Sequence, residues 1–217
     1  MPVIDVPTKM QRLDKNKAGY LIPWFVWRPE DGEPDFRVIG YGKVEQAWND
    51  NLCWVCGNLI TSQYRAFVVG PMCAVNRVSA EPPSHIECAI YSATVCPFLA
   101  NPTMVRRDRG LPAHHGPPGV MIPDNPGVAL VWVSKRSKIE PFDANGTGTL
   151  FDMGPASSVA WFAHGRPATR QEVLDAFEKG LPKLRVPAEA EGTLDRLEVA
   201  IQAAMELVPA EEVRTRA

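Results

Sequence analysis

Short apolar runs bounded by turn residues occupy much of the chain and predict short strands. Residues 24–27 (WFVW) and 36–39 (FRVI) are rich in aromatic and β-branched side chains, and the turn-forming sequence PEDGEP lies between them. This pattern predicts a β-hairpin with a long loop. RAFVV at 65–69 and VALVWVS at 128–134 predict two further strands. The second of these is apolar nearly throughout, so both of its faces should be buried.

Helical signals are clearest in the last third of the chain. The sequence TRQEVLDAFEKG predicts a helix, because Thr169 and Glu172 have the spacing of a capping box and a glycine ends the segment. A second helix is predicted over 187–208, where apolar residues repeat along one stripe. A shorter helix is predicted from Ser84, a suitable N-cap, to the region of Pro97.

The order of these elements predicts an α+β fold, with short strands around a cysteine-containing segment and two helices at the C-terminal end. Residues 101–126 are rich in Pro, Gly and Arg and predict a long loop. We expect four parts: a polar arm at 1–20, a β-rich zinc-binding domain at 21–165, a C-terminal helical segment at 166–208 and a flexible tail at 209–217.

Composition and charge exclude some classes of partner. The 217 residues are 45% hydrophobic and 22% charged, which is typical of a globular protein. A formal net charge of −2 argues against a uniformly basic coat for nucleic acid or membranes, but not against a local patch. No apolar run reaches the roughly 18–20 residues of a membrane span. Because the first residues also lack a signal core, we predict a cytoplasmic protein without membrane contact.

The cysteines supply the candidate chemistry. All five fall between positions 53 and 96, and in a reducing compartment such a cluster is more typical of metal ligands than of disulfides. Cys53 and Cys56 form a C-x-x-C pair, and His85 and Cys88 form an H-x-x-C pair of the same spacing. Zinc commonly takes four nitrogen and sulfur ligands as two close pairs from distant segments.

Local sequence suits both pairs. Gly57 follows the first pair and permits the positive φ of a tight knuckle. His85 and Cys88 fall in the first turn of the predicted helix, where positions i and i+3 share a face and the dipole favours a thiolate. The order of knuckle, strand and helix resembles a treble-clef zinc finger over about residues 50–97. That resemblance implies a structural zinc with four ligands, Cys53, Cys56, His85 and Cys88.

The sequence is also compatible with different uses of the cysteines. The 28 residues between the two pairs depart from the treble-clef pattern and contain Cys73, which could replace one ligand. An iron–sulfur cluster could use Cys53, Cys56, Cys73 and either Cys88 or Cys96, since Cys96-Pro97 is similar to the end of ferredoxin-type runs. Metal-free core cysteines would fit as well. A thioredoxin-like redox pair is a weaker alternative, because the segment NDNLCWVCG lacks the apolar strand that should precede such a pair. Helix rise separates Cys96 from Cys88 by about 12 Å, too far to share one zinc.

A catalytic metal is a weaker interpretation than a structural one. Hydrolytic zinc sites keep an open position beside a general base, whereas here a fourth ligand is at hand. Glu87 gives a partial match to the H-x-E of zinc deaminases, but no P-C-x-x-C follows, so we expect it to face solvent. His114 and His115 are adjacent, and at most one of them could join a site on an extended chain.

Charge is segregated along the chain. Residues 101–140 carry six basic and three acidic side chains, whereas 187–217 carry three basic and seven acidic ones. The positive segment could form a face that binds phosphates. The predicted nucleic-acid-binding residues are Arg106, Arg107, Arg109, Lys135, Arg136 and Lys138.

No common catalytic or nucleotide-binding motif is present: the sequence lacks a P-loop, G-x-G-x-x-G, G-x-S-x-G and H-E-x-x-H. Segments such as GPMCAVNRVSAEPPSH resemble uncharacterised small proteins of bacteria and their phages, a resemblance that implies no activity. The leading hypothesis is a zinc-stabilised accessory or regulatory protein that contacts nucleic acid or a protein partner. Two further hypotheses are a metal-dependent enzyme acting on nucleic acid or nucleotides, and a structural assembly component.

Overall fold

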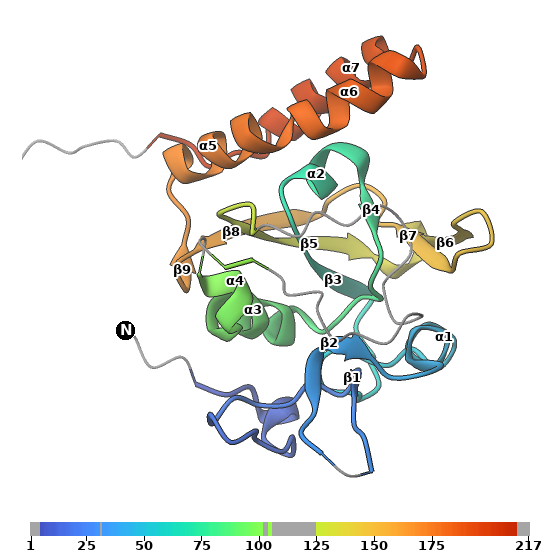
Figure 1. Ribbon diagram of the computed structural model, residues 1–217, viewed down its shortest axis with the longest axis vertical. Helices are drawn as coiled ribbons and strands as arrows, with labels where there is room; N and C mark the ends of the chain where they lie inside the picture. Colours follow the sequence, from blue (N-terminus) through green and yellow to red (C-terminus); the bar gives the residue numbers. More distant parts are fainter. Residues whose placement is uncertain (1–4, 31, 102–103, 106–124, 212–217) are drawn as a thin grey trace, which may run out of the picture.

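A four-stranded antiparallel sheet forms the centre of the protein in the computed structural model, which describes residues 5–30, 32–101, 104–105 and 125–211 (Figure 1). Its strands, in spatial order, are β3 (Tyr64–Val69), β5 (Ala129–Lys135), β8 (Ser158–Ala163) and β9 (Arg166–Pro167). Six of the seven residues of β5 are buried, so the predicted burial of this strand is confirmed. The predicted α+β class is confirmed as well.

Helices cover both faces of this sheet, because successive strand residues point to opposite faces. Trp132 of β5 packs in the core on one side, and its neighbour Val131 packs on the other side against Ala89. The first side is covered by α2 (Met72–Asn76), α5 (Arg170–Gly180) and α7 (Leu194–Met205). The second is covered by α3 (Ile86–Val95) and α4 (Pro97–Ala100). Figure 1 shows the resulting three layers, with the sheet in the middle.

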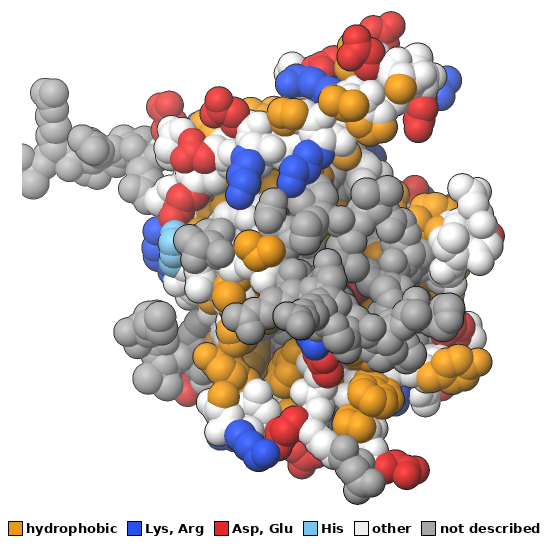
Figure 2. All heavy atoms as spheres, in the orientation of Figure 1, with side chains coloured by type: hydrophobic (Ala, Val, Ile, Leu, Met, Phe, Trp, Pro, Cys, Tyr) orange, Lys and Arg blue, Asp and Glu red, His pale blue; other side chains and the backbone are white. Residues whose placement is uncertain are grey.

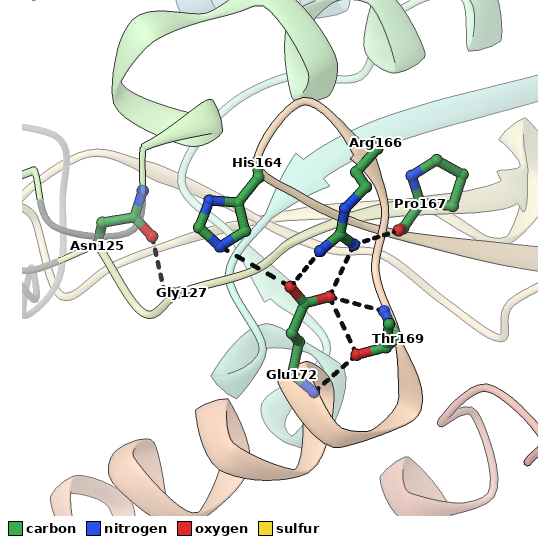
Figure 3. A network of polar contacts seen from close by, with 7 residues as sticks. All are labelled: Asn125, Gly127, His164, Arg166, Pro167, Thr169 and Glu172. Carbon is green, nitrogen blue, oxygen red and sulfur yellow. Dashed lines mark hydrogen bonds and ion pairs between the residues drawn. The ribbon is translucent and has the colours of Figure 1, made fainter. Parts of the chain in front are cut away.

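The capping box predicted at the start of α5 is confirmed. The Glu172 backbone N–H donates to Thr169 Oγ1 at 3.3 Å, and the Glu172 carboxylate accepts from the Thr169 backbone N–H at 2.8 Å. Arg166 adds two N–H···O bonds of 2.9 and 2.7 Å to the same carboxylate, and His164 Nε2 lies 3.8 Å from it (Figure 3). This network joins β9 to α5.

The second predicted C-terminal helix is present as α7, but it is shorter than the predicted range 187–208. Gly192, with φ +69°, makes a turn between α7 and an additional helix, α6 (Pro182–Ala190). The first residues of the predicted helix therefore belong to α6. Ile201 and Val208 of the apolar stripe are buried in the main core, as their spacing predicts.

The predicted hairpin is confirmed by β1 (Val26–Trp27) and β2 (Asp35–Ile39), which pair antiparallel and are followed by α1 (Lys43–Asn49). The hairpin and α1 lie at the end of the molecule opposite the C-terminal helices (Figure 1). A three-stranded sheet is formed by β4 (Val78–Ser79), β7 (Thr149–Asp152) and β6 (Glu140–Asp143), in that order. Two 3-10 turns are η1 (Thr8–Met10) and η2 (Arg136–Lys138).

Helix α3 begins one residue later than its predicted N-cap implies. Ser84 exchanges two backbone hydrogen bonds with Ala66 of β3, at 2.9 and 2.7 Å, so it continues the sheet instead of capping the helix. His85 is the N-cap, with extended φ and ψ of −62° and 147°. The helix ends at Val95, before Pro97, as the geometry of proline predicts.

Candidate metal centre

Four side chains from the two predicted pairs meet in one place. One ligand atom from each lies within 4.8 Å of the other three, and the residues are Cys53, Cys56, His85 and Cys88. We refer to these four residues as the Cys/His cluster. The three cysteines are fully buried, and His85 is only 5% exposed. The described residues contain no other group of this kind, so the cluster is the candidate metal centre.

The first pair is held by a tight turn of the backbone. Leu52 and Leu59 form an antiparallel bridge at its base, and Cys53 N–H donates to the carbonyl of Asn58 at 2.8 Å. The Gly57 N–H returns to the carbonyl of Cys53, also at 2.8 Å, and Gly57 has φ +69°. The positive φ that the sequence predicts for this glycine is therefore confirmed. We call residues 52–59 the knuckle.

The second pair is carried by the start of α3. The Ser84–Ala66 bridge fixes the chain just before His85 against the edge of β3. From there the His85 backbone N–H donates to Cys53 Sγ at 3.3 Å, and the Cys56 N–H donates to the same sulfur at 3.4 Å. Amide donors aimed at a sulfur stabilise the thiolate form that binds metal. Cys88 follows in the first turn of the helix.

The imidazole of His85 is oriented by a backbone carbonyl. Its Nε2 lies 3.3 Å from the carbonyl oxygen of Leu59, which can only accept a hydrogen bond, so Nε2 carries the proton. In the neutral ring Nδ1 then has a free lone pair. It faces two sulfurs, at 3.5 Å from Cys56 Sγ and 3.9 Å from Cys88 Sγ. A partner on the non-ligating nitrogen is the usual arrangement of a metal-binding histidine.

These distances fit a tetrahedral zinc. With Zn–S of about 2.3 Å and Zn–N of about 2.0–2.1 Å, a sulfur and a nitrogen ligand atom stand about 3.6 Å apart. The distances from Nδ1 to the sulfurs of Cys56 and Cys88, 3.5 and 3.9 Å, lie close to this value. The donor set of three sulfurs and one nitrogen is also one that zinc accepts in structural sites.

The protonation of the cluster favours cation binding. Burial raises the pKa of Cys53, but hydrogen bonds from the other three members outweigh it and lower that pKa below its usual range. Burial lowers the pKa of His85, yet hydrogen bonds to Cys53 and Cys56 prevail and raise it to about 9. Without a metal, a protonated imidazole at His85 is therefore the positive partner of the Cys53 thiolate, a place that a divalent cation can take. A divalent metal supplies that charge and releases protons when it binds.

The N-terminal segment packs over the cluster, a feature that the polar sequence did not reveal. Met10 is 2% exposed and belongs to the same apolar cluster as Val55, Ile60 and the three cysteines. Arg12 donates to the carbonyl of Cys56 at 3.1 Å. The sequence signal was a few apolar residues, Val6, Met10 and Leu13, scattered among polar ones without the period of a strand or a helix, which is too weak to predict a contact. The division of the chain into an arm, a domain, a helical segment and a tail stays a prediction.

The other residues that the sequence offered as metal ligands or catalytic groups do not belong to the Cys/His cluster. Cys73 is on α2 and Cys96 is the C-cap of α3, and neither belongs to the cluster. Burial raises the pKa of Cys73 to about 11 and also raises the pKa of Cys96, which makes both thiols unreactive. Glu87 faces the surface and pairs with Lys9 at 2.6 Å, as expected for a solvent-facing residue. His114 and His115 lie outside the described residues.

The predicted nucleic-acid-binding residues are only partly described. Arg106, Arg107 and Arg109 lie outside the described residues. Lys135 and Lys138 are exposed at the end of β5 and in η2. Between them, Arg136 lies 3.7 Å over the ring of Trp48 and is partly buried by it. Of the three described residues, the two lysines are thus exposed and the arginine is partly covered.

No protein-family model, curated protein or solved structure is significantly similar to this chain. Within the described ranges, none of the helices has the length and apolarity that crossing a membrane requires.

Proposed function

We propose that the protein is a binding module built around one structural zinc ion, held by Cys53, Cys56, His85 and Cys88. The orientation of His85 carries this proposal: the Leu59 carbonyl accepts a hydrogen bond from Nε2–H, so Nδ1 is the nitrogen that faces the cysteine sulfurs and would bind the metal. Packing in a core does not require a histidine ring to lie within ligand distance of three cysteine sulfurs. The treble-clef resemblance and the cytoplasmic location are parts of the same proposal.

A structural role fits the cluster better than a catalytic one. Four protein ligands complete a tetrahedron and leave no position for water or substrate. All four residues are buried, so a substrate would have no access to the metal. The nearest acidic side chain along the helix, Glu87, is paired with Lys9 at the surface and not directed at the cluster. These observations favour a module that binds a partner over a metal-dependent enzyme.

Nucleic acid or a protein is the partner class in this proposal. The exposure of Lys135 and Lys138 supports a basic face at the end of β5, to which the sequence adds Arg106, Arg107 and Arg109. Contacts of this kind bind phosphates through counterion release and show little sequence preference.

The metal is tested on the purified full-length chain by elemental analysis and zinc X-ray absorption. We expect about one zinc per chain, with three sulfur neighbours near 2.3 Å and one nitrogen near 2.0–2.1 Å. Cys53→Ser and Cys88→Ser should each lose the metal. Cys73→Ser is the matched control, because it removes a partly buried cysteine outside the cluster and should keep it.

Three results would contradict the proposal. A folded, metal-free preparation would show that the cluster is a packing feature. An iron-containing preparation would favour an iron–sulfur protein. An oxygen neighbour in place of the nitrogen or of one sulfur would indicate an open coordination position and favour the enzyme hypothesis over the binding module.

A further inference from the structure

A groove of about 340 Å³ lies between β1 and the turn before α1. Three of its lining residues are aromatic, Trp24, Trp27 and Tyr41, and two are basic, Arg28 and Lys43. None of its lining residues is acidic. Hydrophobic side chains are exposed over this end of the molecule, around β1, β2 and α1 (Figure 2).

Two aromatic side chains of the groove are exposed at the surface. Tyr41 is 99% exposed and stands between Gly40 and Gly42, in a turn where Gly42 has φ +67°. Trp27, on β1, is 37% exposed. An aromatic side chain as exposed as Tyr41 supplies a flat surface on which another planar group can stack.

The basic side chains give the groove a positive charge. Lys43 Nζ lies 3.7 Å over the ring of Trp24, and no carboxylate within the described ranges pairs with it. Arg28 is paired with Asp14 at 2.8 Å through one of its terminal nitrogens, which leaves the rest of the guanidinium open. Burial, and after it the charge of Arg28, lower the pKa of Lys43. An anion at this place would relieve that repulsion.

The groove is built directly on the knuckle. The Trp24 backbone N–H donates to the carbonyl of Val55 at 2.7 Å, and the Trp24 indole lies so close to Gly57 that a Cβ there would overlap it. Next to it, Phe25 stacks on Trp54 of the knuckle, with ring centroids 4.6 Å apart and planes within 4°. The metal-bound form of the knuckle would therefore fix one wall of the groove.

We propose that this groove binds single-stranded nucleic acid, with a base stacked on Tyr41 and phosphates bound by Lys43 and Arg28. The inference rests on the proposed function, because the knuckle that positions Trp24 is the part that zinc would hold. Sequence-tolerant readers of single strands combine these two features, aromatic platforms and a basic track. A duplex hides its base faces, so it offers the aromatic rings nothing to stack on.

A proline-rich peptide is the other ligand class that docks on aromatic grooves. The charge decides against it: two cations without an acidic lining residue favour a ligand that carries an anion at every repeat. Every nucleotide of a single strand carries such an anion, its phosphate.

The test is fluorescence anisotropy of labelled oligothymidine and oligouridine with the full chain at low and moderate salt, alongside a duplex and a polyproline peptide. We expect either single strand to bind at least about ten times more tightly than the duplex. Tyr41→Ala should weaken binding by about 5- to 100-fold, the range of one lost stacking contact. Lys43→Ala should reduce the salt slope by about 0.7.

Two further variants locate the site. Phe142→Ala is the control: it removes an aromatic residue that is 42% exposed on β6, far from the groove in sequence, and should bind like the wild type. Lys135→Ala combined with Lys138→Ala removes two cations of the basic face at the end of β5, and should lower the salt slope without removing the preference for single strands over the duplex. Tyr41 is almost fully exposed, so its replacement leaves the fold intact and any loss reports on binding.

Zinc content, measured on each sample, separates this inference from the proposed function. A zinc-loaded wild type that binds no single strand, or binds polyproline instead, overturns the groove assignment alone. Loss of binding when Lys135 and Lys138 are both replaced, but not in Tyr41→Ala, also overturns the groove assignment and moves the site to the end of β5. A zinc-free, folded wild type overturns the structural zinc, whatever it binds.

Discussion

The buried apolar side chains that pack together with the three cysteines are few and of moderate size, with the stacked rings of Trp54 and Phe25 beside them, whereas the central sheet has a large core of bulky side chains. Met10, Val55 and Ile60 are the buried apolar residues that accompany the three cysteines. The main core contains Phe67, Trp132 and many others of that size, all nearly inaccessible to solvent. Apolar burial scales with area, so the sheet can be stable through packing alone. The cluster region needs another source of free energy, and metal binding can supply it.

Helix α3 belongs to both regions. Cys88 points into the Cys/His cluster, while Ala89 and Ala93 pack on β3 and β5. The two regions therefore share one helix but differ in what holds them. The predictions below separate them, starting with the change that affects stability most.

Removal of the metal should have the largest effect, and it should be local. Chelation, or Cys88→Ser, is expected to destabilise the knuckle by several kcal/mol, because binding free energy is folding free energy in small zinc sites. Hydrogen exchange should show loss of protection in 52–59 and in the β1–β2 hairpin, with β5 still protected.

The converse change tests the other half of the comparison. Phe177, which is 2% exposed and packs edge to face on Trp161 at 5.8 Å, lies in the main core. Phe177→Ala should cost about 3–5 kcal/mol in denaturant unfolding and leave the zinc stoichiometry unchanged.

The hydrogen-exchange experiment can contradict the comparison itself. If chelation removed the protection of β5 together with that of the knuckle, the two regions would be one cooperative unit.

Gly57→Ala should have an intermediate effect of roughly 2–4 kcal/mol, measured by denaturant unfolding. Alanine would be strained at φ +69°, and its Cβ would overlap Trp24. Gly192→Ala is the matched control, because Gly192 has the same φ of +69° but open space at the Cβ position. That variant should lose only about 1 kcal/mol. Equal losses in the two variants would contradict the close packing of Trp24 on the knuckle.

Cys96→Ala should leave the zinc content unchanged and cost about 1 kcal/mol of stability. The reason is that Cys96 caps the far end of α3, outside the Cys/His cluster. Elemental analysis and thermal unfolding of the variant provide the measurement. Release of the metal would mean that Cys96 takes part in the site and that α3 is not continuous from Ile86 to Val95.

Acid should weaken the start of α5 by a small amount. Hydrogen bonds from Arg166, opposed by partial burial, lower the pKa of Glu172 to about 2 from its ordinary value of 4.5. A lowered folded-state pKa means that the stabilisation is complete above about pH 4.5 and is lost as the pH falls toward 2. Unfolding free energies measured across this window should fall less in Glu172→Gln, which has no carboxylate to protonate. An identical pH dependence would exclude this contribution.

The sequence by itself determined the features that depend on residues close together in the chain. The spacing of Cys53 and Cys56, the glycine behind them and the Thr169–Glu172 capping box each fit within one turn, so their geometry follows from local backbone preferences. The apolar run of β5 likewise predicted burial on both faces, since no residue of it could face water at low cost.

Tertiary structure decided the rest. Ser84 pairs with Ala66 instead of capping α3, Met10 packs over the Cys/His cluster, and the Leu59 carbonyl orients His85. Each of these contacts joins residues far apart in the chain or uses a backbone atom that every residue carries. Contacts of these two kinds leave no pattern in the sequence, because they form only once the sheet has brought the segments together.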